Sequence, residues 1–217
     1  MQYIERHIES MDWVTVTLVF CLLIVTIAKY VYPREFQQFI TLPISNKYFL
    51  VQGKTQQIFH LFNILLFIVQ VFSVSLFIFL FFKVLQPETV QANKYLFIQI
   101  CTAYSVFVCA KFSVEKIIGT AFSLDPVINS YLFQKLSYRN LISLFLFIIN
   151  LFLYYIIQPT GTLLLLFTAA IILFNGIALF YSYKTNRNLI MSNFFYFILY
   201  LCALEISPYF ILYKTMV

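Results

Sequence analysis

The sequence predicts an all-α membrane protein in which residues 1–217 form a single integral membrane domain with six transmembrane helices. The first observation is composition: 62% of the 217 residues are hydrophobic and only 10% are charged, whereas about 25% of the residues in a soluble domain are charged. The second is a series of six apolar runs near the length, roughly 20 residues, that crosses a bilayer as a helix. These runs take up most of the chain, so no soluble domain is expected.

The six predicted helices are separated by recognisable boundaries. They cover residues 13–32, 58–82, 95–116, 141–157, 162–183 and 193–213. Pro33 and Pro87 follow the first two runs, and proline ends a helix because it has no backbone N–H to donate. Only Gln158–Gly161 separate the fourth run from the fifth, so these two helices are expected to form a tight antiparallel hairpin.

The two long loops between these helices are expected to contain short amphipathic helices in the membrane interface. Pro33 suits the first position of one helix, and Asp125 with Pro126 can begin the other. Each segment places aromatic side chains at helical spacing beside a basic residue, and the candidate interfacial docking residues are Arg34, Phe36, Phe39, Tyr131 and Lys135. We interpret these faces first as lipid anchors, with docking of another protein as the alternative.

The orientation of the chain follows from the distribution of its 14 lysines and arginines, because cytoplasmic loops carry an excess of these residues. Ten fall in or beside the first, third and fifth loops, namely Lys29, Arg34, Lys47, Lys54, Lys111, Lys116, Lys135, Arg139, Lys184 and Arg187. The other four are Arg6, Lys83, Lys94 and Lys214. The three loops are therefore predicted to be cytoplasmic, and both termini periplasmic.

Several classes of function are disfavoured by what the sequence lacks. The formal net charge of +6 is explained by basic loops that face anionic lipid, so no nucleic acid partner is expected. No hydrolase, metalloprotease, P-loop or dinucleotide-binding motif is found. His60 is the one histidine that can lie within the membrane, and the four cysteines lie in apolar runs without a CxxC pair. We therefore predict no metal, no cofactor and no enzymatic activity.

The candidate intramembrane polar site is centred on Glu205 in the sixth predicted helix. A charge at the bilayer centre costs roughly 2.5–3.5 kcal/mol, so such a side chain is expected to face a partner inside the bundle. Ser207 and Pro208 follow closely, and the proline frees a backbone carbonyl and favours a bend. Possible partners of Glu205 are ranked by their depth along the helices. The site as a whole is predicted to include Glu205, Ser207, Pro208, Lys111, Tyr104 and Gln70. Helix-packing hydrogen bonds are the favoured interpretation, and a proton-titrating or ion-binding site is the alternative.

Four stretches of the chain resemble one known family. They are LYLCALEISPYFILYK at Leu199–Lys214, DWVTVTLVFCLLIVTIAKYVYPREFQQF at Asp12–Phe39, NKYF at Asn46–Phe49 and NSYLFQKL at Asn129–Leu136. Together they resemble an uncharacterised multi-pass inner-membrane family of Bacteroidota, a domain of unknown function, with YLCALEISP as the most specific part. The resemblance implies a Gram-negative inner membrane and carries no catalytic residue over to this chain.

The leading hypothesis is a non-enzymatic inner-membrane protein that serves as an accessory or scaffold subunit of a larger membrane assembly, such as a machine for protein export or envelope biogenesis. Its expected partners are membrane lipid and other inner-membrane proteins in a hetero-complex. The alternative is a small-molecule or proton-coupled transporter that uses buried Glu205. The variant Glu205→Gln separates them, because glutamine keeps the hydrogen bonds but not the charge.

Overall fold

The computed structural model describes residues 12–42, 60–121, 125–157 and 159–185. In these ranges all regular secondary structure is helical, and no strand is present. The seven helices are α1 (Asp12–Val31), α2 (Pro33–Ile40), α4 (Leu61–Leu85), α5 (Pro87–Ala92), α6 (Leu96–Ala121), α7 (Asp125–Tyr155) and α8 (Gly161–Thr185).

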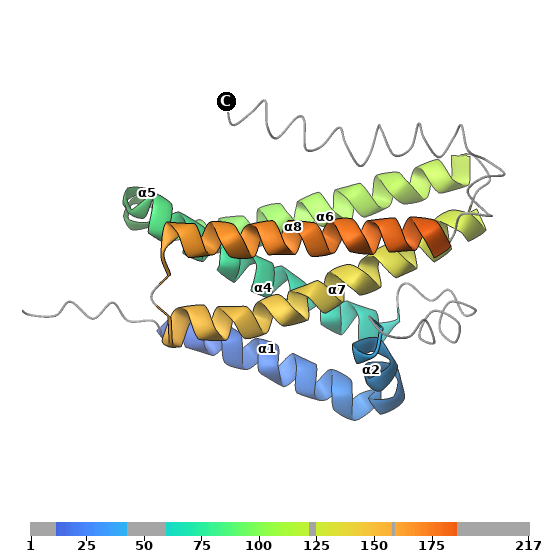
Figure 1. Cartoon of the computed structure of the whole chain (residues 1–217), viewed down its shortest axis with the longest axis horizontal. Coiled ribbons are helices and arrows are strands. Elements are labelled where there is room, and N and C mark those ends of the chain that lie inside the picture. Colours follow the sequence, from blue (N-terminus) through green and yellow to red (C-terminus); the bar gives the residue numbers. More distant parts are fainter. Residues whose placement is uncertain (1–11, 43–59, 122–124, 158, 186–217) are drawn as a thin grey trace, which may run out of the picture.

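The five long helices run along one common axis, and α4 lies among the others (Figure 1). Helix α4 packs against α1, α6, α7 and α8. It contributes Val69 and Leu76 to a core that also contains Leu18 of α1, Leu153 of α7 and Leu164 of α8. The short helices α2 and α5 lie at opposite ends of this bundle (Figure 1). The central position of α4 explains why its sequence is apolar around most of its circumference, since a helix buried on all sides has no polar face.

Among the described residues, four helices are long and apolar enough to cross a membrane, which bears out part of the six-helix prediction. The qualifying segments are Asp12–Val31, Leu61–Leu85, Leu96–Ile117 and Ile128–Tyr155. Helix α8 contributes a shorter apolar segment, Gly161–Ile177, and packs against α7 after a short connection, as the predicted hairpin requires. The predicted sixth helix, residues 193–213, lies outside the described residues. Length and composition therefore fit an integral membrane protein.

Helix α7 differs from the prediction, which divided its sequence into a short interfacial helix and a membrane span over residues 141–157. The structure has one continuous helix of 31 residues. Pro126 occupies the first turn, where proline is tolerated, and no glycine or proline follows within the helix. The polar residues at the expected break are buried and bonded within the helix: Ser137 Oγ donates to the carbonyl of Phe133, and Ser143 Oγ to that of Asn140. Nothing therefore interrupts the hydrogen-bond ladder.

Helix α2 begins at Pro33 as expected, but its apolar face packs into the bundle. Phe36 and Phe39 are buried and belong to a second core cluster with Phe62 of α4 and Leu132 of α7. The Phe39 and Phe62 rings meet edge to face, with centroids 5.8 Å apart. These two phenylalanines, which the sequence placed in a lipid-facing or docking surface, instead attach α2 to its own chain. A sequence pattern gives the apolar face of a short helix but not what covers it.

Candidate functional site

The residues of the predicted intramembrane site divide between the described and undescribed parts of the chain. Glu205, Ser207 and Pro208 lie outside the described residues. Gln70 of α4 and Tyr104 of α6, both predicted members of the site, are brought together by the structure: Gln70 Nε2 donates a hydrogen bond to Tyr104 Oη at 2.6 Å. Gln70 is fully buried, so this bond holds α6 against α4 in the middle of the bundle.

A second set of polar contacts connects α4 to α7, and we call it the α4–α7 seam. Ser73 Oγ donates to the carbonyl of Ser143 at 3.0 Å, and Asn150 Nδ2 donates to the carbonyl of Ser73 at 2.8 Å. About one turn after Asn150 on α7, Tyr154 Oη donates to the carbonyl of Leu76 at 3.0 Å. All five residues are buried. The seam therefore supplies donors from side chains to backbone carbonyls of the facing helix, which is a packing device common between membrane helices.

The predicted interfacial residues Tyr131 and Lys135 belong to a polar cluster between α6 and α7. Lys135 Nζ donates to Glu115 Oε1 at 2.7 Å, and the side chains are 13% and 3% exposed. The ammonium group also lies over the Tyr131 ring, 5.6 Å from its centroid. Lys116 Nζ donates to Asn129 Oδ1. Lys135 thus faces its own bundle, whereas Arg34 on α2 is exposed.

Sequence reasoning missed Glu115, although it named Lys111 and Lys135 nearby. Glu115 lies four residues after Lys111, on the helix face that also carries Val108 and Phe112, because residues three or four apart are neighbours on a helix. With Lys111 and Lys135, it lines a small hollow of about 20 Å³. The signal that could have found it is the one carboxylate in the α6 sequence, four residues after Lys111 on the same helix face.

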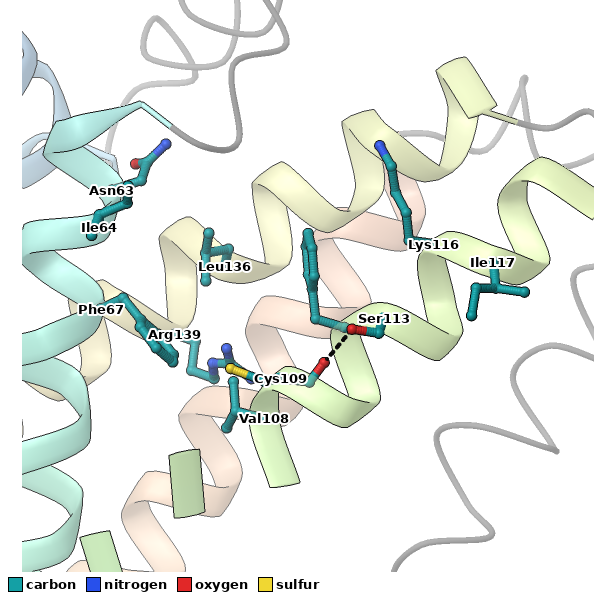
Figure 2. A pocket seen from close by; sticks show the side chains of 11 residues that line it. Asn63, Ile64, Phe67, Val108, Cys109, Ser113, Lys116, Ile117, Leu136 and Arg139 are labelled. Carbon is teal, nitrogen blue, oxygen red and sulfur yellow. Dashed lines mark hydrogen bonds between the residues drawn. The ribbon is translucent and has the colours of Figure 1, made fainter. Parts of the chain in front are cut away.

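A larger cavity of about 510 Å³ lies between α4 and α6, with α7 behind it (Figure 2). Its walls are mainly hydrocarbon, from Ile64, Phe67, Val108, Phe112, Ile117 and Leu136. The remaining lining residues are Asn63, Cys109, Ser113, Lys116 and Arg139. Arg139 Nε is buried and has no hydrogen-bond partner in the described structure. The sequence identified Arg139 only as a loop charge, since its depth depends on α7 being continuous.

No arrangement of three or more His, Cys, Asp or Glu side chains suited to a metal occurs within the described ranges. Cys21, Cys101 and Cys109 are present as free thiols. The described part of the chain therefore offers three polar features: a hydrogen-bonded interior along α4, the Glu115–Lys135 cluster between α6 and α7, and a cationic, largely apolar cavity at one end.

Comparison with known proteins places this chain in a family. The profile of one family, described as Domain of unknown function (DUF4271), matches residues 14–216. The chain belongs to this family. The match includes all the helices above, apart from the first residues of α1, and also the stretch that contains Glu205. It confirms the coarser part of the prediction, namely that the chain belongs to a family of unknown function. No match was found for this DUF4271 chain among curated proteins or among solved structures.

Proposed function

We propose that this protein is a non-enzymatic, multi-pass inner-membrane protein that acts as an accessory or scaffold subunit of a larger membrane assembly. The observation that carries the proposal is that polar side chains at the centre of the bundle form hydrogen bonds between helices. Gln70, Ser73, Asn150 and Tyr154 all donate to a neighbouring helix. They hold helices together, and none of them lines either of the two cavities described above.

This arrangement favours a static role over transport. Alternating access requires one group of helices to rock or open against another, and such motion would break the contacts of α4 with α6 and α7. Each interhelical hydrogen bond in a membrane contributes on average about 0.6 kcal/mol, so these four bonds supply roughly 2 kcal/mol, in addition to the packing of the core around Leu76 and Leu164. The bundle is therefore suited to present a fixed outer surface.

That outer surface supports the choice of partner. Large apolar side chains are exposed along α6 and α8, among them Ile98, Val106, Leu166, Ile172 and Phe174, which are 58–68% exposed. Such surfaces suit lipid and the apolar helices of other membrane proteins, and they offer nothing to nucleic acid. We therefore include other inner-membrane proteins, in a hetero-complex, as the expected partners.

The proposed topology places the end of the bundle with α2 in the cytoplasm and both termini in the periplasm. The described basic residues support it, because Lys29 is in the last turn of α1 and Arg34 is on α2, whereas Lys83 and Lys94 flank α5 at the opposite end. In a variant without native cysteines, a cysteine replacing exposed Glu88 of α5 should react with a membrane-impermeant maleimide in intact cells. A cysteine replacing exposed Gln37 of α2 should react only after lysis, and the reverse pattern would contradict the topology.

The test of the function is purification of the full-length tagged protein in a mild detergent, followed by identification of what accompanies it. We expect a membrane protein at constant stoichiometry, and recovery only as a free monomer or homodimer would overturn the subunit role. Glu205→Gln is the second arm: assembly and cell function should both be kept. Intact assembly with lost cell function would favour transport through a titrating Glu205 instead.

A further inference from the structure

The cavity between α4 and α6 has features that neither the proposed scaffold role nor the family assignment explains. Its volume of about 510 Å³ lies within the range of roughly 300–1,000 Å³ that is usual for ligand pockets. It lies at the end of the bundle that carries α2, near the start of α4 and the last turns of α6. Ile64 and Ile117, on its two sides, are 41% and 66% exposed, so the cavity adjoins the outer apolar surface of the bundle.

The charge inside the cavity is positive. Arg139 extends from α7 into the space between α4 and α6, and Lys116 lies farther toward the end of α6 (Figure 2). No Asp or Glu is among the described residues that line this cavity. Glu115, the nearest carboxylate along α6, accepts its hydrogen bond from Lys135, outside the cavity. Arg139 adjoins both this cavity and the small hollow lined by Glu115, yet its Nε is buried and makes no hydrogen bond in the described structure.

A buried donor without an acceptor is costly, and more so when it is charged. The cost is removed by a ligand that brings an anionic oxygen acceptor, and arginine binds phosphate with two parallel hydrogen bonds. The apolar walls require that the same ligand carry hydrocarbon. A phospholipid with net negative charge meets both requirements, and basic pockets between membrane helices on the cytoplasmic side are known to bind anionic headgroups.

We propose that this cavity is a binding site for one anionic phospholipid. The headgroup phosphate accepts hydrogen bonds from Arg139, and the acyl chains lie against the apolar walls, entering sideways from the bilayer between Ile64 and Ile117. Lys116 adds a second positive charge on the headgroup side. The site is formed by three helices of one chain and does not depend on the scaffold role.

The experiment is native mass spectrometry of the full-length, delipidated protein titrated with phosphatidylglycerol and, separately, with phosphatidylcholine. We expect one molecule of phosphatidylglycerol to bind preferentially. Arg139→Gln should weaken this binding roughly tenfold or more, as expected for loss of a charged hydrogen bond. Arg34→Gln is the matched control, because Arg34 lies at the same end of the bundle, is exposed on α2 and is not part of the cavity. It should change the affinity less than about twofold.

A steric variant keeps the test decisive if Arg139→Gln does not fold. Ser113→Phe leaves every charge in place and fills the cavity from α6, so it should also abolish the preferential binding. Equal binding of both lipids, unchanged binding in Arg139→Gln, or equal weakening in Arg34→Gln would overturn the proposal. Inorganic phosphate should not compete at millimolar concentration, and full competition would assign the site to a free anion instead. Displacement of bound lipid by a copurified protein would assign the cavity to that partner.

Discussion

The ion pair between Glu115 and Lys135 gives the sharpest test of how α6 and α7 are held together. The two charged atoms are 2.7 Å apart and their side chains are 3% and 13% exposed. At an effective dielectric constant of about 20, their attraction is roughly 6 kcal/mol, from which the cost of desolvating both groups has to be subtracted. Removing one partner of a buried pair typically costs about 3–5 kcal/mol. Because Lys135 keeps its contact with the Tyr131 ring, we expect the lower value for Glu115→Gln.

A loss of about 3 kcal/mol corresponds to a fall in Tm of roughly 6–12 °C for a chain of this size. It is measured by heating the protein in detergent and following the folded fraction by size-exclusion chromatography. Glu88→Gln is the matched control: the same chemical change on an exposed residue of α5 should leave the Tm almost unchanged. Glu115→Gln combined with Lys135→Met should recover part of the loss, because no charge is then left buried. A Tm for Glu115→Gln equal to that of Glu88→Gln, or a double variant as unstable as the sum of its singles, would refute the reasoning.

Two further variants test the seam and the position of α2. Tyr154→Phe removes only the hydroxyl that donates to Leu76 O. The free energy of unfolding, measured by a detergent titration, should fall by about 0.6 kcal/mol and by no more than about 1.7 kcal/mol. Tyr30→Phe, on a residue that is 87% exposed, should have no effect. Phe39→Ala should lower the stability by about 3 kcal/mol, because Phe39 is fully buried and a cavity would remain. Ile40→Ala, 48% exposed on the same helix, should cost much less, and equal effects would mean that α2 lies on lipid.

The long helices could be predicted because their existence depends on local composition. A run of apolar residues of sufficient length has few alternatives to a membrane helix, and the expected ranges 13–32, 58–82 and 95–116 correspond closely to α1, α4 and α6. The continuity of α7 across residues 136–141 could not be predicted from hydropathy. Ser137 and Asn140 lower the local hydropathy as a loop would, yet both are buried because the neighbouring helices cover them.

For the candidate site, the sequence predicted only how deep in the membrane each polar residue lies along its helix. Ranking by depth placed Tyr104 near the level of Glu205 and named Gln70 only as a further polar group, and the structure pairs these two residues with one another. The pairing of Glu115 with Lys135 and the burial of Arg139 Nε could not be derived, since each depends on how α6 rotates about its axis to face α7. Rotation is set by tertiary packing, which a single sequence does not encode in a readable pattern.

The unbroken length of α7 has a mechanical consequence. A helix of 31 residues is about 46 Å long, whereas the hydrocarbon of a bilayer is about 30 Å thick. The hydrocarbon therefore accommodates about five turns of α7, and the remaining turns project beyond it. Because no hinge residue interrupts the rod, a sideways force on the projecting turns is carried directly to the buried turns that hold Asn150 and Tyr154. The helix therefore connects the turn that holds the ion pair with Glu115 rigidly to the α4–α7 seam.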